Sequence, residues 1–217
     1  MSIKIVIVDD HGIMREGLKL LLEKHDDMEI IGEATDGRKS VYIARSLKPD
    51  LVLMDVSMPN LNGIEATQQI IEDNPAIKIL AFSAYSEKRF VTDMLKAGAS
   101  GYILKDALSE ELIRAIRTVM NNQFFLSTKV AGIVISDYIS DASSAPNRSI
   151  GVLTSKEREL LQLLVENKSS KEAARILHVS IKTVDARRRS VMNKLDLNGI
   201  ADLTKFAIRE GLTTVEF

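Results

Sequence analysis

The sequence predicts an α/β domain built on a five-stranded parallel sheet, followed by a small all-α domain of four helices. Three observations support this prediction. Apolar runs alternate with segments of helical periodicity through the first half of the 217 residues. The second half contains two helix-capping patterns and no apolar run typical of a strand. Between the halves, residues 141–147 are small and polar with one proline, as in flexible linkers.

Five short apolar runs are expected to form the strands of the first domain. Their interiors are almost wholly apolar, which is typical of a parallel sheet covered by helices on both faces. Turn signals such as Asp36-Gly37 and Asn74-Pro75 separate them from the helical segments, and a last helix is expected over residues 109–121. The runs are residues 3–8, 28–33, 51–54, 77–82 and 102–104.

The second domain is expected to contain four short helices. Capping boxes at residues 154–157 and 169–172 open the first two helices. Ser180 is the expected N-cap of a third helix over Ile181–Leu195, and a fourth is expected over residues 200–210. The predicted boundaries are 1–121 for the first domain, 122–148 for a linker with a helical segment, and 149–214 for the second domain.

Composition and charge exclude several classes of protein and site. No apolar run approaches the ~20 residues that span a bilayer, so no membrane partner is expected. The absence of cysteine excludes disulfides and thiolate metal sites, and a cytoplasmic location is expected. Residues 1–126 carry 15 basic and 19 acidic side chains, or −4, whereas residues 148–217 carry 13 and 9, or +4. This asymmetry favours a polyanionic partner for the second domain.

Polar residues stand at the carboxyl ends of four predicted strands. Asp9 and Asp10 follow the first strand, Asp55 the third, Ser83 the fourth and Lys105 the fifth. In an open parallel sheet these ends share one edge, where such folds bind their ligands. Three carboxylates suit Mg²⁺ or Mn²⁺, and a carboxylate is also an acyl-phosphate nucleophile. The lysine and the hydroxyl offer contacts to phosphate oxygens, so the edge predicts a site for a divalent metal and a phosphoryl group.

The motifs around these residues resemble the receiver domain of two-component response regulators, over about residues 3–121. The resemblance implies a flavodoxin-like sheet of strand order 2-1-3-4-5. It also implies that Asp55 is the phosphoacceptor, loaded by a sensor histidine kinase. Asp10, Asp55 and the Ser57 carbonyl would bind Mg²⁺, with Asp9 acting through water. The motifs are Val8-Asp9-Asp10-His11, Leu53-Met54-Asp55-Val56-Ser57-Met58-Pro59, Phe82-Ser83-Ala84 and Gly101-Tyr102-Ile103-Leu104-Lys105.

The same resemblance assigns a switch around the phosphate. Lys105 would pair with the phosphate, and Ser83 together with the Ala84 amide would take its oxygens. Tyr102 would be the aromatic partner that turns inward when Ser83 moves. Asp106 departs from the pattern, because many receivers have a cis-proline after the lysine.

The expected helix Ile181–Leu195, which follows a short turn and carries several bases, predicts DNA reading in a helix-turn-helix. The residues expected on its core face are Ile181, Val184, Val191 and Leu195. Those expected opposite, where side chains read base edges, are Lys182, Asp185, Ala186, Arg189 and Asn193. Those expected to hold phosphates are Thr183, Arg187, Arg188 and Lys194.

This segment resembles the LuxR-type helix-turn-helix of the NarL/FixJ branch of response regulators, over about residues 151–212. Asn167 replaces a usual glycine after the first helix. By this resemblance the last helix mediates dimerisation of the DNA-binding domain. Leu203, Phe206 and Ala207 are its candidate residues, with core packing as the alternative role. The motifs include Leu153-Thr154, Glu157-Arg158-Glu159, Lys171-Glu172-Ala173-Ala174, Lys182-Thr183-Val184 and Lys194-Leu195.

The two resemblances together predict a phosphorylation-dependent transcription regulator. Double-stranded DNA and a second copy of the chain are its expected partners, with dimerisation favoured by phosphorylation. One alternative is an aspartyl-phosphate-type phosphatase, but position 57 is serine where such enzymes need an acid, and no inserted segment is long enough for a cap. Another alternative is a receiver whose second domain is a protein-binding adaptor.

Overall fold

The computed structural model describes residues 2–141, 152–197, 199–210 and 212–213. The chain divides into two compact units, residues 1–144 and 145–217, and each is treated by itself. The linker predicted within residues 141–147 lies almost wholly outside the described residues. No helix in the described part of the chain is long and apolar enough to cross a membrane.

The first unit is a parallel sheet with helices on both faces. Its strand order is β2-β1-β3-β4-β5-β6, and every neighbouring pair is parallel. The strands are β1 Ile3–Val8, β2 Met28–Ala34, β3 Leu51–Met54, β4 Lys78–Ser83, β5 Gly101–Leu104 and β6 Phe125–Leu126. The helices are α1 Gly12–Leu22, α2 Gly37–Leu47, α3 Gly63–Asp73, α4 Lys88–Lys96, α5 Ser109–Met120 and α6 Thr128–Asp141.

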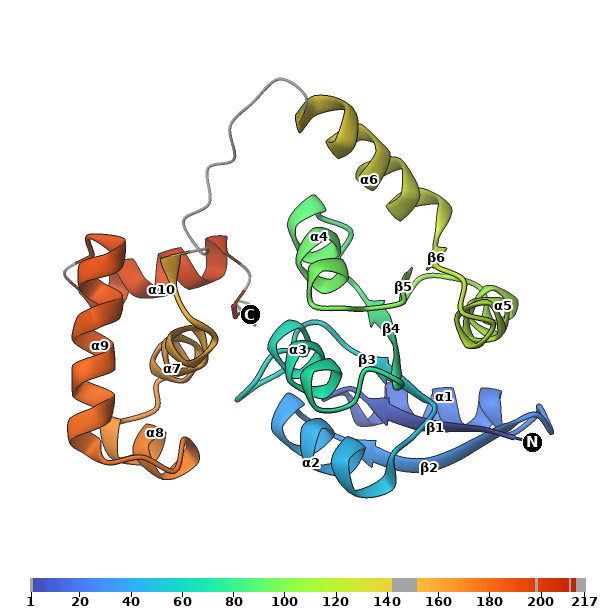
Figure 1. Cartoon of the computed structure of the whole chain (residues 1–217), viewed down its shortest axis with the longest axis horizontal. Coiled ribbons are helices and arrows are strands. Elements are labelled where there is room, and N and C mark those ends of the chain that lie inside the picture. Colours follow the sequence, from blue (N-terminus) through green and yellow to red (C-terminus); the bar gives the residue numbers. More distant parts are fainter. Residues whose placement is uncertain (1, 142–151, 198, 211, 214–217) are drawn as a thin grey trace. The chain divides into compact units, whose positions relative to one another are not determined.

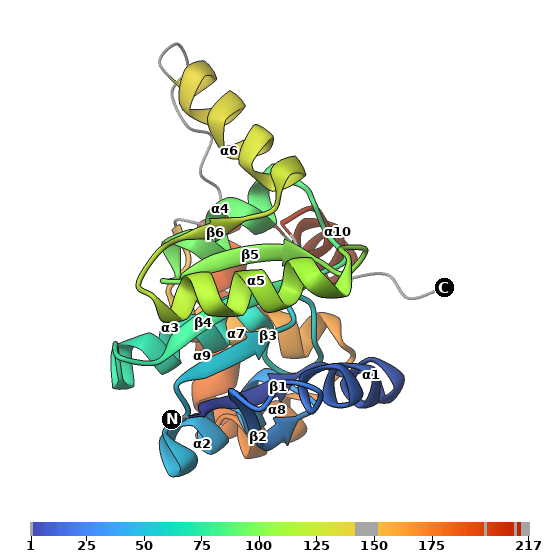
Figure 2. The ribbon, with the colours of Figure 1, turned by 90° about the vertical axis from the view of Figure 1, so that its right-hand side faces the viewer.

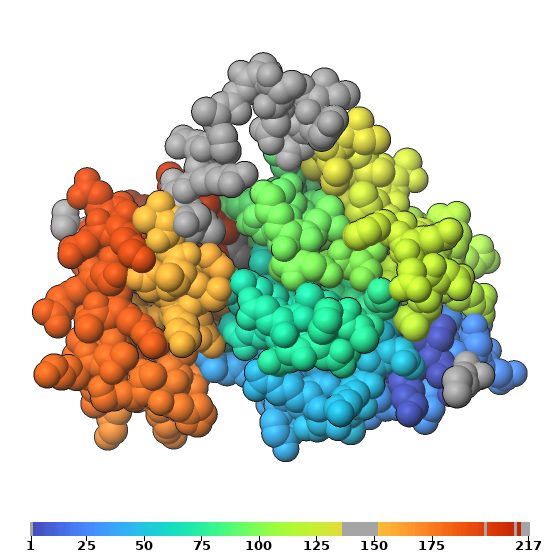
Figure 3. Space-filling model, viewed as in Figure 1, coloured from blue at the N-terminus to red at the C-terminus, as the bar shows by residue number. Residues whose placement is uncertain are grey.

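Two apolar cores hold the helices against the sheet, one on each face. Helices α1 and α5 bury Leu18, Leu22 and Ile116 on one face, and Figure 2 shows α5 lying across it. Helices α2, α3 and α4 cover the other face, where their side chains form a continuous surface (Figures 1 and 3). Because the sheet is covered on both faces, β3 is buried at all four positions, as its apolar sequence predicts.

The sheet has six strands rather than the predicted five. The extra strand, β6, is two residues long and pairs with β5 at the edge of the sheet. A strand of two residues is too short to show the hydrophobic alternation by which strands are predicted from sequence. It leads into α6, whose Val130 is fully buried in the core beside α4. The helical segment expected after residue 124 is therefore present and packs on the first unit.

The second unit contains the four predicted helices. They are α7 Ser155–Val165, α8 Ser170–Ile176, α9 Ile181–Leu195 and α10 Ile200–Arg209. Both predicted capping boxes are present, and Ser180 Oγ accepts a hydrogen bond from the Thr183 amide at the start of α9. Asn167, which follows α7, has a φ of 62°. Asparagine tolerates this left-handed conformation, which explains how it serves where the related pattern has glycine.

Candidate functional site

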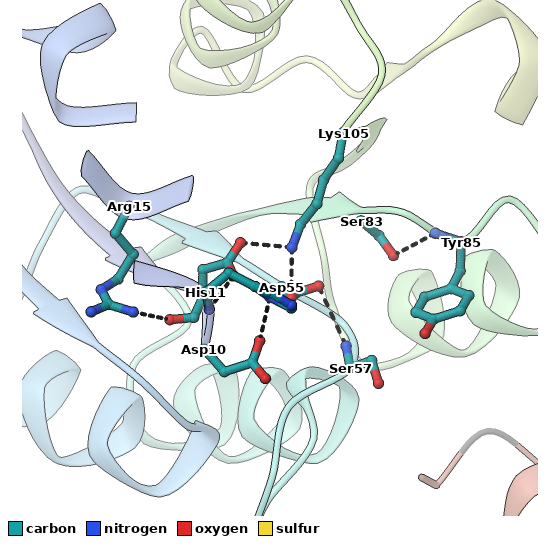
Figure 4. A network of polar contacts seen from close by, with 9 residues as sticks. Asp10, His11, Arg15, Asp55, Ser57, Ser83, Tyr85 and Lys105 are labelled. Atoms are coloured by element: carbon teal, nitrogen blue, oxygen red, sulfur yellow. Dashed lines mark hydrogen bonds and ion pairs between the residues drawn. The ribbon is translucent and has the colours of Figure 1, made fainter. Parts of the chain in front are cut away.

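The carboxylates predicted at the sheet edge lie together in the structure. One ligand atom each from Asp9, Asp10, Asp55 and His11 lies within 4.8 Å of the other three. Asp9 and Asp55 are 1% and 3% exposed, whereas Asp10 is half-buried. Figure 4 shows the cluster at the ends of β1 and β3. Three hard oxygen donors in this arrangement fit a divalent metal such as Mg²⁺ or Mn²⁺.

Lys105 joins this cluster from the end of β5. Its Nζ lies 2.7 Å from Asp9 Oδ2 and 2.8 Å from Asp55 Oδ2. Burial alone would lower the pKa of Lys105, but the charge of Asp55 and the hydrogen bonds to both carboxylates outweigh it and raise the pKa. The ammonium therefore stays charged and neutralises part of the acidic cluster.

Asp55 differs from an ordinary surface carboxylate in its proton affinity. Burial raises its pKa to about 6, although Lys105 acts in the opposite direction. The carboxylates of Asp9 and Asp10 raise it further. Its Oδ1 accepts a long hydrogen bond, 3.4 Å, from the Ser57 amide. The carboxylate is held between two fixed contacts, which suits a nucleophile that must be oriented.

Ser83, Tyr85 and Tyr102 form a second polar group beside the cluster. The Ser83 hydroxyl oxygen accepts a hydrogen bond from the Tyr85 amide at 3.1 Å (Figure 4). The Tyr102 hydroxyl donates to the Tyr85 carbonyl at 2.7 Å, and its side chain is fully buried. Tyr102 thus already points inward, and both residues hold the backbone of Tyr85. Ala84, between Ser83 and Tyr85, is exposed.

Most of the residues predicted to contact DNA lie on the open face of α9. Lys182, Asp185, Ala186, Arg189 and Asn193 are all exposed, whereas Thr183, Arg187 and Arg188 are half-buried. Val184 and Val191 face the core as predicted. Ile181 does not: it is 47% exposed, because the first residue of a helix lies beyond the edge of the core.

Lys194 has a partner within its own unit. Its Nζ lies 2.7 Å from Glu157 Oε2, and Ser190 Oγ donates to the other Glu157 oxygen at 2.8 Å. Glu157 also accepts hydrogen bonds from the amide and hydroxyl of Thr154. This ion pair competes with the phosphate contact predicted for Lys194, and it ties α9 to the start of α7.

Comparison with known proteins settles the family. Residues 5–117 match the response regulator receiver domain, and residues 151–207 match the bacterial regulatory proteins of the luxR family. The chain belongs to the two-component response regulators. It is a response regulator of the NarL/FixJ branch, with a receiver domain and a LuxR-type DNA-binding domain, and it acts in the control of transcription.

Three known proteins illustrate the similarity. The oxygen regulatory protein NreC of Staphylococcus carnosus is 35% identical over 96% of this chain and 98% of its own length. A LuxR-family response regulator from Aurantimonas has a TM-score of 0.62 at 32% identity, covering 64% of this chain and all of that one. RcsB from Salmonella enterica serovar Typhimurium, solved on promoter DNA with a phosphomimetic, has a TM-score of 0.61 at 23% identity over 95% of this chain and 98% of its own, which shows the fold alone.

Two functional candidates in this response regulator were not found from the sequence. His11 Nδ1 lies 2.9 Å from Asp10 and 3.2 Å from Asp9. Arg15 donates to the Asp9 carbonyl at 2.8 Å and pairs with Glu33, so it fixes the end of β1 (Figure 4). His11 directly follows the two acids in the sequence, so its place beside them could have been predicted. The contact of Arg15 with Asp9 could not, because it depends on how the first turn of α1 folds back towards β1.

The candidate dimerisation residues of α10 lie in the core of the response regulator's second unit. Leu203, Phe206 and Ala207 are 0%, 6% and 0% exposed and pack against α7 and α9. Their dimerisation role stays a prediction, and core packing explains why they are apolar. For α10 to meet a partner, it would have to present other side chains, such as Ile200, which is 45% exposed.

Replacing Asp55 with asparagine is expected to stabilise the metal-free receiver at neutral pH. The pKa of Asp55 is about 6 when folded and about 3.9 in an unfolded chain, so the folded state binds more protons between these values. The stability of the wild type therefore falls as the pH rises through that window. We expect Asp55→Asn to be more stable by up to about 3 kcal/mol at pH 7, with the difference shrinking towards pH 4.

The measurement is urea unfolding in EDTA, followed by far-ultraviolet circular dichroism at both pH values. Asp26→Asn is the matched control, because Asp26 is exposed in the turn before β2, at the opposite edge of the sheet from the acidic cluster. The control is expected to change stability little at either pH. An equal gain for both variants would show that burial of the Asp55 charge is not the cause.

Replacing Gly63 with alanine is expected to displace the backbone that carries Asp55. A Cβ on Gly63 would lie 1.9 Å from the Asp55 carbonyl oxygen and 3.0 Å from Val56 Cα, so the backbone must move. We expect a loss of about 1–3 kcal/mol in the free energy of unfolding, measured by urea denaturation. Gly17→Ala in α1 is the control, because its Cβ meets nothing within 4 Å. It should leave stability unchanged or raise it by up to about 1 kcal/mol.

Proposed function

We propose that phosphorylation of Asp55 by a sensor histidine kinase switches this response regulator between states with different affinity for double-stranded DNA. One observation carries the proposal. The buried Asp55 carboxylate lies within hydrogen-bonding distance of the Lys105 ammonium, inside a cluster that fits a divalent metal. An oxygen of Asp55 attacks the phosphorus of a phosphohistidine whose other ring nitrogen carries a proton, the P–N bond breaks, and the imidazole leaves as a neutral ring that keeps this proton.

The neighbouring residues have defined tasks in this proposal. Asp9, Asp10 and Asp55 would hold the metal together with the Ser57 carbonyl. A bound divalent cation supplies positive charge that offsets the phosphoryl oxygens. Lys105 gives up one carboxylate partner and pairs with the phosphate, which carries more negative charge than the acid it replaces.

The signal would leave the site through Tyr85. When Ser83 turns its hydroxyl to a phosphate oxygen, the hydrogen bond from the Tyr85 amide breaks, while the one from Tyr102 to the Tyr85 carbonyl remains. The segment before α4 then loses one of two anchors. Because phosphorylation can only bias states that already exist, some of the active form should be present without phosphate.

The output proposed for the second unit is DNA binding as a homodimer. The exposed polar face of α9 supports this, together with the net charge of +4 over residues 148–217, 13 basic against 9 acidic. RcsB, which shares the fold, is described on promoter DNA. We place the receiver at residues 1–121, the linker at 122–148 and the DNA-binding domain at 149–214, and we propose a cytoplasmic location, where promoter DNA and the kinase meet.

The test combines mass spectrometry, light scattering and DNA footprinting on the full chain. With acetyl phosphate and Mg²⁺, the wild type should gain the mass of one phosphoryl group. With beryllofluoride, the fraction of dimer should increase and selected DNA should be protected more strongly. Asp55→Asn should show none of these responses. Phosphorylation of the Asp55→Asn variant would contradict the proposal. So would a wild-type DNA affinity that is the same with and without beryllofluoride.

A further inference from the structure

His11 places a ring nitrogen against two carboxylates of the metal cluster. Its Nδ1 lies 2.9 Å from Asp10 Oδ1 and 3.2 Å from Asp9 Oδ1 (Figure 4). His11 is also the N-cap of α1, yet its side chain makes no capping hydrogen bond. Instead its amide donates to Asp9 Oδ1 at 2.9 Å, which fixes the turn so that the imidazole lies over the cluster.

The carboxylate oxygen nearest the ring nitrogen lacks an ordinary hydrogen-bond partner. Asp10 Oδ1 is buried and accepts no hydrogen bond within the described part of the chain. Asp9 Oδ2 faces the Lys105 ammonium, and Asp10 Oδ1 faces the imidazole nitrogen. A neutral nitrogen lone pair and a carboxylate oxygen repel one another at 2.9 Å unless a proton or a cation lies between them.

The spacing of these atoms suits ligands of one octahedral ion. Two ligands at about 2.1 Å from an ion and at right angles lie about 3 Å apart, and opposite ligands lie about 4.2 Å apart. The distances of 2.9 and 3.2 Å from Nδ1 match adjacent positions. The largest separation in the group of four ligand atoms, 4.8 Å or less, accommodates opposite ones.

We propose that His11 is a ligand of the cation in this cluster and that it shifts the preference of the site from Mg²⁺ towards Mn²⁺. Mg²⁺ is bound through carboxylates, carbonyls and water, whereas first-row divalent ions also accept imidazole nitrogen, and Mn²⁺ is the one that shares the oxygen ligands of Mg²⁺. The imidazole side chain is 67% exposed, so a substitution at His11 removes the nitrogen donor without opening a cavity in the core. This inference rests on the metal site of the proposed function and adds a nitrogen donor to it.

The test measures the coordination of Mn²⁺ directly on the full, unphosphorylated chain. Pulsed electron paramagnetic resonance of bound Mn²⁺ should show coupling to a ¹⁴N nucleus in the wild type and lose it in His11→Gln. Titration of the free Mn²⁺ signal should show about a tenfold weaker affinity in His11→Gln, while the Mg²⁺ affinity, measured by competition, changes less than about twofold. His25→Gln, a change at one of the two other histidines, should match the wild type in each measurement.

The outcomes separate this inference from the proposed function. If the wild type binds both ions without ¹⁴N coupling, His11 is not a ligand and the carboxylate site stands. If His11→Gln weakens both ions equally, the residue only orients Asp10, and the proposed preference for Mn²⁺ is wrong. If the wild type binds neither ion, the metal site of the proposed function fails as well.

Discussion

Glu157→Ala is expected to cost the DNA-binding domain about 2–3 kcal/mol of its stability. Glu157 is the N3 residue of the α7 capping box, and its side chain is 8% exposed. Removing it leaves the Thr154 amide without its cap and the Lys194 ammonium without its counter-charge. Removing one partner of a fully buried ion pair costs about 3–5 kcal/mol, but Lys194 is 35% exposed, so the ion pair contributes less here and the lost cap adds about 1 kcal/mol.

The pH dependence of the stability of this domain also depends on Glu157. Burial would raise the pKa of Glu157, but hydrogen bonds from Lys194, Thr154 and Ser190 outweigh it and lower the pKa from 4.5 to about 2. A depressed pKa contributes stability that is present above about pH 4.5 and is lost as the pH falls towards 2. The Lys194 side chain is 35% exposed, so solvent screens the ion pair and the stability linked to this shift is smaller than the ~3 kcal/mol that the shift alone would imply.

Hydrogen exchange on the full chain, read by mass spectrometry, localises the effect. Peptides from α7 and α9 should exchange faster in Glu157→Ala, and peptides from the receiver sheet should not change. Glu172→Ala is the matched control, because Glu172 closes the capping box of α8 from an exposed position. If both variants lose protection equally, the cap alone accounts for the effect and the ion pair contributes nothing.

The sequence predicted the parts of this protein that depend on local patterns. Strands β1 and β3 begin and end at the predicted residues, and both capping boxes formed, because apolar runs and cap residues act within a few positions. The acidic cluster was also predictable, since the carboxyl ends of parallel strands must share an edge.

The features that were missed depend on contacts between distant segments. Strand β6 exists because Phe125 and Leu126 pair with β5. Two residues are too few to show the hydrophobic periodicity by which a strand is predicted. Ser83 was expected beyond the end of β4 but is its last residue, since β4 pairs with β5 for one residue more. Glu157 was recognised as a cap, yet its ion pair joins residues 37 positions apart and appears only in the fold.

The sequence preference of DNA binding is expected to depend on Arg189 far more than on Arg188. Arg189 is exposed on the face of α9 opposite Val184 and Val191, and its Nε donates to the Asp185 carbonyl at 3.3 Å, which directs the side chain along the helix. Arg188 is half-buried at the flank of that face. A guanidinium on the groove-facing side reads guanine, whereas one at the flank holds a phosphate.

Fluorescence anisotropy on a site selected by the wild type from random DNA, and on a scrambled copy, measures both effects. Arg189→Ala should weaken binding to the selected site by about 1–3 kcal/mol and leave the scrambled site nearly unchanged, so that discrimination falls. Arg188→Ala should weaken binding to both sites alike. It should also reduce the slope of log affinity against log salt concentration by about one, the contribution of one phosphate contact. Equal losses on both sequences for both variants would remove Arg189 from base reading, because only a contact to base edges distinguishes one sequence from another.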